Sequence, residues 1–282
     1  MDQAELKEMV RARYGSIAEA ASATDCCAPA TSCCGPSAAG TPASKSLEMG
    51  YSEAELAAVP DGANLGLGCG NPQAIAALRP GEVVIDLGSG AGFDCFLAAR
   101  QVGAAGHVIG VDMTHEMLKK ARDNAAKIGA GNVEFRLGEL EYLPVADNTA
   151  DAILSNCVIN LVPDKAQVFR EAFRVLKPGG RLAISDVINA APLPTDLQAD
   201  TTLLCGCIAG AAPAIQIETW LTAAGFTDIR VTAKPESREL IKNWLPGRRL
   251  EDYVVSAIVE GRKPAVGEVA PDACCAPSCC AS

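Results

Sequence analysis

Cysteine offers the most distinctive chemistry in this sequence, because 13 of its 282 residues are cysteines and only two are histidines. Three of these cysteines fall in segments that we expect to border a binding site. Cys69 lies in a glycine-rich loop, Cys157 ends a predicted strand, and Cys207 follows the last predicted parallel strand. Cysteines of a cytosolic chain more often bind soft atoms or do redox chemistry than form structural disulfides. Three thiolates would suit a soft, three-coordinate, pyramidal ion.

Other interpretations of these cysteines are available. A buried cysteine can simply act as a small apolar side chain; we favour this for Cys95, within a predicted helix, and leave it open for Cys205. Zinc is an alternative soft ion, but it prefers four ligands and has no lone pair that could act as a nucleophile. Trivalent arsenic forms three As–S bonds and keeps such a pair. Because thiolates are the ligands, we expect the site to lower the pKa of its thiols.

A second distinctive segment is the glycine-rich turn after the apolar residues 83–87. Its glycines are Gly88, Gly90 and Gly92. Glycines at alternate positions permit a tight turn and a close approach of a ligand to the backbone. Asp112 ends the next predicted strand, where an acid commonly meets ribose hydroxyls. The Asp86 carboxylate would repel a pyrophosphate but suits a cationic ligand such as a sulfonium amino acid. The alternative is a turn with a purely structural role.

The elements that position these residues alternate between strands and helices. We predict strands at 83–88, 107–112, 133–138, 152–157 and 181–188, with helices up to 102, at 114–128 and at 164–176. A further helix near 216–224 and strands near 229–233 and 252–260 complete the pattern. This alternation predicts an α/β fold with a Rossmann-like, doubly wound, mostly parallel sheet.

The two ends of the chain differ in composition from its centre. We predict a helix at 2–14, a flexible arm at 16–46 and a short helix at 52–58 that begins with a capping box. The predicted division is an N-terminal helix and cysteine-rich arm (1–50), a cofactor-binding domain that holds the thiol site (51–230), C-terminal strands (231–261) and a cysteine-rich tail (262–282).

The net charge and hydropathy of the chain limit the kinds of molecule that it could bind. The formal net charge is -10, whereas binding to a nucleic-acid backbone needs a basic face. No apolar run reaches the ~18 residues of a membrane span, and the first 15 residues lack the apolar centre of a signal peptide. We therefore expect a cytoplasmic protein with no nucleic-acid or membrane partner.

The glycine turn and the strand ends resemble those of class I S-adenosylmethionine-dependent methyltransferases, as does the segment Leu176–Gly180 before the fifth strand. The resemblance implies S-adenosylmethionine as cofactor and a function for each matching residue. Asp86 and the three glycines would shape the cofactor loop, and Asp112 would bind the ribose. Met113 would flank the adenine. Glu139 and Leu140 would lie at the edge of the adenine, and Asn156 would lie in the cofactor site.

A closer resemblance is to the arsenite methyltransferases. It rests on the segments Gly68–Pro72, Ile109–Thr114, Ser155–Lys165 and Cys207–Ala211. It implies that Cys69, Cys157 and Cys207 bind As(III), which arrives as arsenite or a thiol conjugate such as a glutathione complex. It also implies successive methylations, with thioredoxin or glutathione as reductant, and disulfide exchange by Cys26 or Cys27. Leu67 departs from the family, in which many relatives carry an aromatic residue near this position.

Two other functions remain open at this point. The chain could methylate a small organic or lipid acceptor, or it could bind a metalloid without catalysis. The terminal cysteine doublets could capture arsenite, form a zinc or redox site, or have no function. These cysteines are Cys26, Cys27, Cys33, Cys34, Cys274, Cys275, Cys279 and Cys280.

Overall fold

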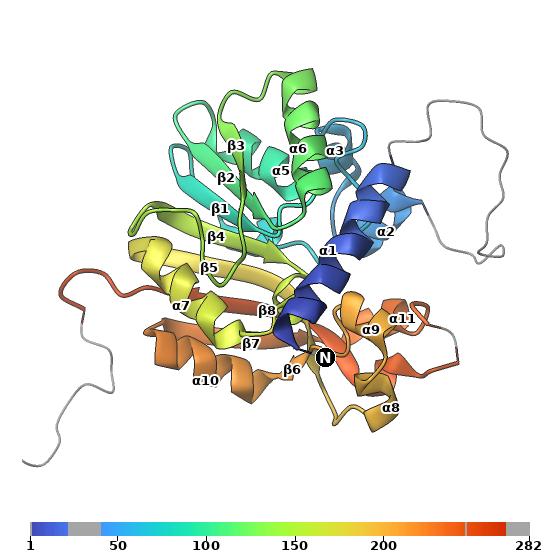
Figure 1. The fold of residues 1–282 in the computed structure, drawn as a ribbon. Helices are drawn as coiled ribbons and strands as arrows, with labels where there is room; N and C mark the ends of the chain where they lie inside the picture. The colour runs from blue at the N-terminus through green and yellow to red at the C-terminus, as the bar shows by residue number, and fades with distance from the viewer. Residues whose placement is uncertain (1, 22–40, 246, 269–282) are drawn as a thin grey trace, which may run out of the picture.

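The computed structural model describes residues 2–21, 41–245 and 247–268. Within them, one eight-stranded sheet has the order β3-β2-β1-β4-β5-β8-β7, and β6 pairs with β5 (Figure 1). The strands are β1 (Val83–Leu87), β2 (His107–Asp112), β3 (Val133–Leu137), β4 (Ala150–Asn156), β5 (Leu176–Asn189), β6 (Ala212–Pro213), β7 (Thr227–Lys234) and β8 (Val254–Arg262). Strands β1 to β5 pair in parallel, whereas β8 runs antiparallel to both β5 and β7. The predicted doubly wound, mostly parallel fold is confirmed.

The central strands are apolar on both faces because helices cover both. The helices are α5 (Phe93–Val102) and α6 (His115–Ile128) on one face and α7 (Lys165–Val175) and α10 (Ala214–Ala224) on the other (Figure 1). Successive residues of a strand point to opposite faces. Val84 accordingly packs with α5, whereas Ile85 packs in the cluster that holds Phe169 of α7. The carboxyl ends of β1, β2 and β4 are thereby fixed at one edge of the sheet.

The largest difference from the predicted strands is at β5. We predicted that Lys177–Gly180 stops a helix and that the strand begins at residue 181, but β5 already begins at Leu176. Gly179 and Gly180 exchange backbone hydrogen bonds with Lys263, at the end of β8. Leu176 also pairs with Ala150 of β4. Partners distant in the chain therefore extend β5 into a segment whose local sequence is typical of a turn.

The N-terminal segment contains more helix than its composition suggests. Helix α1 (Gln3–Ala20) begins with a capping box between Asp2 and Glu5 and runs past the predicted end at residue 14. Helix α2 (Pro42–Glu48) begins at the N-cap Thr41. The predicted arm at 16–46 is therefore wrong at both of its ends. Its centre lies outside the described residues, as do Cys26, Cys27 and the other terminal cysteines.

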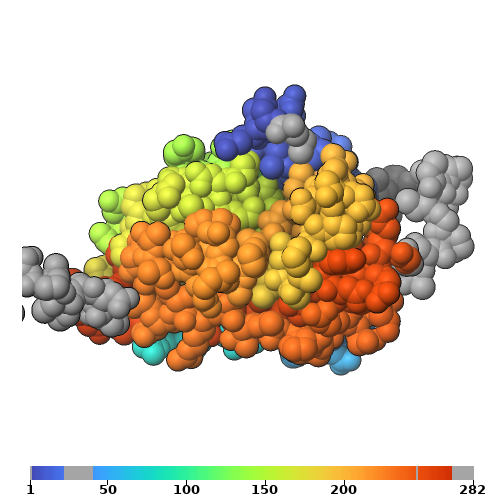
Figure 2. All heavy atoms as spheres, turned by 90° about the horizontal axis from the view of Figure 1, so that it is seen from below, coloured from blue at the N-terminus to red at the C-terminus, as the bar shows by residue number. Residues whose placement is uncertain are grey.

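Helix α3 (Glu53–Ala57) has the predicted capping box between Ser52 and Glu55 and is followed by α4 (Gln73–Ala76). Several short helices beside the C-terminal half of the sheet were not predicted. They are η2 (Ile159–Leu161), α8 (Thr195–Gln198), α9 (Thr201–Cys205), η3 (Pro235–Ser237), α11 (Arg238–Ile241) and η4 (Leu250–Asp252). In Figure 2, α1 (blue) rests against the gold segment around residue 200, in agreement with the contacts between α1 and α9.

None of the helices in the described ranges is long and apolar enough to cross a bilayer. The division of the chain at residues 50, 230 and 261 stays a prediction.

Candidate active site

A cavity of about 780 Å³ lies at the carboxyl ends of β1, β2 and β4. It runs from the glycine turn to the segment that contains Cys207. The predicted site residues that line it are Asp86, Gly88, Gly90, Asp112, Met113, Leu140, Asn156, Cys157 and Cys207. Of the predicted site residues that the structure describes, Cys69, Gly92 and Glu139 do not line it.

The glycine turn leaves room for a ligand beside Asp112. The Gly90 N–H donates to Asp112 Oδ2 at 2.9 Å, and the Thr114 N–H donates to Oδ1 at 2.8 Å. A Cβ built on Gly90 would meet no atom within 4 Å, although its φ of +51° favours glycine. Each carboxylate oxygen of Asp112 keeps acceptor capacity for a hydroxyl. The open turn and this carboxylate fit the ribose end of a nucleoside.

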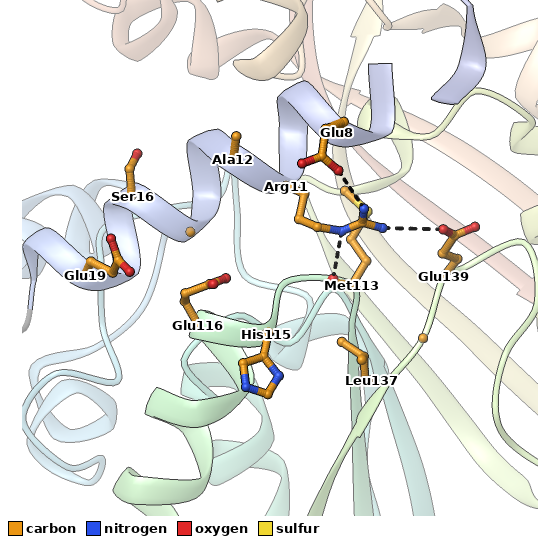
Figure 3. Close-up of a pocket in the computed structure, with 12 residues that line it drawn as sticks. Glu8, Arg11, Ala12, Ser16, Glu19, Met113, His115, Glu116, Leu137 and Glu139 are labelled. Atoms are coloured by element: carbon orange, nitrogen blue, oxygen red, sulfur yellow. Dashed lines mark hydrogen bonds and ion pairs between the residues drawn. The ribbon is translucent and has the colours of Figure 1, made fainter. Parts of the chain in front are cut away.

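Two predicted cofactor residues are placed away from the cavity. A Cβ on Gly92 would lie 2.8 Å from the Phe96 ring and 2.9 Å from the Phe135 ring, so this glycine lets α5 start close to the sheet. Glu139 pairs with Lys7 of α1 at 2.6 Å, and its side chain faces a second groove of about 640 Å³ between α1 and α6 (Figure 3). Its role at the adenine edge stays a prediction.

Two buried carboxyl groups lie beside the turn, and we predicted only one of them. The Tyr51 hydroxyl donates to Asp94 Oδ1 at 2.8 Å, and the Cys95 thiol donates to Asp86 Oδ2 at 3.2 Å. Burial and the neighbouring Asp94 raise the pKa of Asp86. Burial also raises the pKa of Asp94, to about 6, against hydrogen bonds that lower it. This acidic wall would interact favourably with a cation in the cavity.

The raised pKa of Asp94 predicts a pH dependence of stability. A carboxyl group whose pKa rises from 3.8 to about 6 on folding stabilises the fold fully below pH 3.8, and that contribution is lost as the pH rises through 6. Relative to Asp94→Asn, the parent chain should lose up to about 1.4 kcal/mol per pH unit over this window. Urea unfolding of both proteins from pH 4 to pH 7.5 measures the difference. A difference that does not vary with pH would contradict this account.

Asn156 fastens the loop that carries Cys69 to the end of β4. Its Oδ1 accepts from the Cys69 N–H at 3.1 Å. Its Nδ2 donates to the Gly70 carbonyl at 2.8 Å and to the Tyr51 hydroxyl at 3.0 Å. Asn156 lines the cavity, as its predicted cofactor role requires, but its hydrogen bonds also give it a role in placing Cys69.

Two of the three predicted thiols, those of Cys157 and Cys207, line one end of this cavity, and the third, Cys69, lies next to Cys157. The Cys157 thiol hydrogen-bonds with those of both Cys69 and Cys207. The Cys207 thiol also donates to the Cys157 carbonyl at 2.7 Å, and the Cys69 thiol lies 3.6 Å from the Ser185 carbonyl oxygen. Ligand atoms of Cys69, Cys157 and Asp186 all lie within 4.8 Å of one another. Segments that are 88 and 50 residues apart (157 minus 69, 207 minus 157) thus meet around Cys157, although Cys207 is not part of the 4.8 Å group.

Two of the three cysteines have a strained backbone. Cys157 has a φ of +58° and Cys207 a φ of +64°, a left-handed conformation that costs about 1–2 kcal/mol for a residue other than glycine. Strain of this kind persists where surrounding contacts impose it and is concentrated at functional sites.

The expectation that the site lowers the pKa of its thiols is wrong. Burial raises the pKa of Cys69 to about 12. The hydrogen bond with Cys157, together with burial, raises the pKa of Cys207. The pKa of Cys157 is lowered by its hydrogen bond with Cys207, but the bond with Cys69 and burial outweigh this and raise it. The site therefore holds protonated thiols, and a ligand must displace those protons.

A polar pair that we did not predict supports the thiol site. Asn160 Nδ2 donates to Asp186 Oδ1 at 2.9 Å and to the Cys207 carbonyl at 3.1 Å. The other oxygen of Asp186 accepts from the Ile159 N–H at 3.0 Å. Burial raises the pKa of Asp186 to about 7. An acid within the apolar strand segment 181–188 was the available signal for this pair.

Comparisons with known proteins agree with this geometry. A model of the methyltransferase domain family matches residues 78–240. The arsenite methyltransferase of Halobacterium salinarum is 53% identical over 268 residues, which cover 94% of this chain and 68% of that protein. The arsenite methyltransferase of Aquipseudomonas alcaligenes is 46% identical over 171 residues, which cover 58% of this chain and 49% of that protein.

Solved structures show the same relationship. An arsenic(III) S-adenosylmethionine methyltransferase from Chlamydomonas reinhardtii superposes with a TM-score of 0.60 at 31% identity, covering 82% of this chain and 76% of that one. A phosphoethanolamine N-methyltransferase from Haemonchus contortus, in complex with S-adenosylmethionine, shares the fold at 20% identity, with a TM-score of 0.57 over 70% of this chain and 54% of that one. This chain therefore belongs to the S-adenosylmethionine-dependent arsenite methyltransferases.

Proposed function

We propose that this chain methylates trivalent arsenic while Cys69, Cys157 and Cys207 hold it. The observation that carries the proposal is the position of Cys157 and Cys207, with Cys69 next to Cys157, at one end of a cavity whose other end is the glycine turn and Asp112. One cavity could therefore hold the methyl donor and the metalloid next to each other. Such proximity supplies much of the rate of a bimolecular reaction.

The residues present fit S-adenosylmethionine, which supplies an electrophilic methyl group on a sulfonium sulfur. The turn at Gly88 and Gly90 would let the cofactor approach the backbone, and Asp112 would accept hydrogen bonds from ribose hydroxyls. Met113 and Leu140 offer apolar contact to the base. The acids Asp86 and Asp94 lower the energy of positive charge in the cavity.

The thiols would bind arsenite by exchange. Each thiol forms one As–S bond, and its proton leaves with a displaced hydroxide as water, or with a displaced thiolate when the substrate is a thiol conjugate. Three protonated thiols and one arsenite thus give one As(S)₃ unit and three waters. This exchange starts from protonated thiols, in agreement with the raised pKa of these cysteines. The bound arsenic keeps one lone pair, and this pair would form the bond to the methyl carbon as the carbon–sulfur bond breaks.

Arsenic carries no proton in this step, so no catalytic base is required. Both histidines agree with this scheme, because neither lines the cavity. His107 faces Glu134 at 3.5 Å, and His115 lies in the groove between α1 and α6.

The same chemistry suggests the partners of the reaction. Arsenic is oxidised from the trivalent to the pentavalent state when its lone pair forms the As–C bond, so a reductant must act before a further cycle. Thioredoxin or glutathione would serve, and glutathione conjugates of arsenite would be substrates in the cytoplasm. Cys26 or Cys27 would exchange disulfides during this step; both lie outside the described residues.

Incubation with arsenite, S-adenosylmethionine and glutathione should convert arsenite to methylated arsenicals, with one S-adenosylhomocysteine formed per methyl group. Separation of the arsenic species by chromatography and mass spectrometry measures the products. Arsenic binding without S-adenosylhomocysteine would indicate a non-catalytic metalloid-binding protein. Methylation of an organic acceptor without stoichiometric arsenic binding would instead favour the other class I function.

A further inference from the structure

Helix α1 forms one wall of the cavity. Its residues Val10, Tyr14 and Ile17 line it, at the spacing of one helical face. Polar contacts fix the helix to the segments that follow β2 and β3. Figure 3 shows the Arg11 guanidinium between the Met113 carbonyl and Glu139, and Lys7 pairs with both Glu139 and Glu141. These contacts hold α1 over the loop that follows β3, and they thereby also hold Tyr14 against the thiol site.

Tyr14 contacts the segment of the third cysteine through its hydroxyl. This group donates to the Cys205 carbonyl at 3.2 Å and interacts electrostatically with the Cys207 thiol. The ring packs in an apolar cluster with Val10, Leu161 and Cys207. A residue 193 positions earlier in the chain (207 minus 14) thus packs against the cluster that contains one of the three cysteines.

We propose that Tyr14 is a positioning residue of the arsenic site, whose hydroxyl orients the Cys207 sulfur toward the metalloid. The proposal rests on the function proposed above. A phenol has one proton to donate and lone pairs to accept with. While Cys207 is protonated, its thiol donates a hydrogen bond to the Cys157 carbonyl, and the Tyr14 hydroxyl donates one to the Cys205 carbonyl. Once arsenic has replaced the thiol proton, the sulfur can only accept, and the hydroxyl beside it can donate to it.

The need for such a partner follows from the backbone of the third cysteine. Cys207 follows a five-residue helix and adopts a left-handed φ of +64°. A residue with that strain keeps its conformation only while its surroundings impose it. Asn160 holds the Cys207 carbonyl from the side of the sheet, and Tyr14 holds the sulfur and the preceding turn from the side of α1.

The test compares Tyr14→Phe with Tyr142→Phe, a matched control whose side chain is 72% exposed and lies outside the cavity. The full-length chain is used with its eight terminal cysteines changed to serine and Cys205 changed to alanine, so that the probe reacts with Cys69, Cys157 and Cys207, while Cys95 stays buried against Asp86. The probe is phenylarsine oxide, which has two exchangeable positions and binds two thiols. Binding is followed by the fluorescence of Trp244, which lines the cavity.

Two parent variants, Cys69→Ser and Cys207→Ser, separate an effect of Tyr14 on Cys207 from an effect on the whole site. In Cys69→Ser the probe must use Cys157 and Cys207, and Tyr14→Phe should weaken its binding about tenfold, the effect of one hydrogen bond. In Cys207→Ser the probe must use Cys69 and Cys157, and the same change should leave the affinity within about twofold. Tyr142→Phe should have no effect in either background.

Equal weakening in both backgrounds would show that Tyr14 only supports the fold and would overturn the proposal. Unchanged affinity in Cys69→Ser would overturn it as well. Failure of the probe to bind a chain with all three thiols is a different result, which would overturn the trithiol site and the role of Tyr14 with it.

Discussion

Replacement of Cys157 by serine should abolish arsenite methylation, with a loss of at least about a hundredfold, while binding of S-adenosylmethionine persists. Cys157 is the central member of the site, because its thiol contacts both Cys69 and Cys207. A serine hydroxyl is a hard ligand that binds trivalent arsenic far less stably than a thiolate does. Without the central sulfur, Cys69 and Cys207 cannot hold the metalloid in a fixed direction toward the methyl donor.

The variant is compared with Cys205→Ala, which removes a buried thiol that lines the same cavity but contacts neither Cys69 nor Cys157 through a hydrogen bond among the described residues. Calorimetry should give the same affinity for S-adenosylmethionine in both variants and in the parent chain. Product analysis should show methylated arsenic with Cys205→Ala and none with Cys157→Ser. Turnover by Cys157→Ser at the parent rate would refute the three-thiol scheme.

The sequence predicted the sheet well because its signals are local. The apolar segments at 83–88 and 107–112, each followed by an acid or a glycine turn, define strands that are buried on both faces. β5 was the exception, since its first residues are held by distant partners: Leu176 pairs with Ala150 of β4, and Gly179 and Gly180 hydrogen-bond to Lys263 after β8. The length of α1 was underestimated because much of its support comes from contacts with α6 and α9 rather than from its own sequence.

The site was predicted in part for the same reason. Strand ends and glycines located Asp86, Asp112 and Cys157, because parallel strands bring their carboxyl ends to one edge. The contacts of Tyr14 and Asn160 depend on how α1 and η2 dock, which no local pattern encodes. The pKa values of the thiols were mispredicted because the local sequence does not reveal that these cysteines would be buried close to one another.

Protonated thiols have a functional consequence. A buried trithiolate would carry three negative charges in a cavity that already contains several acids, at a large cost in solvation energy. Neutral thiols avoid this cost, and exchange with arsenite leaves a neutral As(S)₃ unit. The acids Asp86 and Asp94 then remain available for the positive charge of the methyl donor.

The Gly210→Ala substitution should give the second large effect, because it separates the segment of Cys207 from the loop that orients it. A Cβ at Gly210 would lie 2.0 Å from the backbone oxygen of Asn160. A backbone atom cannot move aside as a flexible side chain can, so the two segments must part. This would weaken the hydrogen bond from Asn160 to the Cys207 carbonyl and displace the third sulfur. We expect a loss of about 1–3 kcal/mol of folding stability and about a hundredfold of methylation rate.

Gly131→Ala is the matched control, because its added Cβ would meet no atom within 4 Å. It should change neither the urea midpoint of unfolding nor the rate. In Gly210→Ala, arsenite binding should weaken much more than S-adenosylmethionine binding, since the glycine turn and Asp112 lie on other strands. Equal losses of both affinities would mean that the whole cavity had collapsed, and unchanged arsenite binding would mean that the segment of Cys207 does not depend on Asn160. The expected selective loss would instead show that the third ligand of the metalloid is placed by the docking of two loops, and not by the sheet that carries the cofactor site.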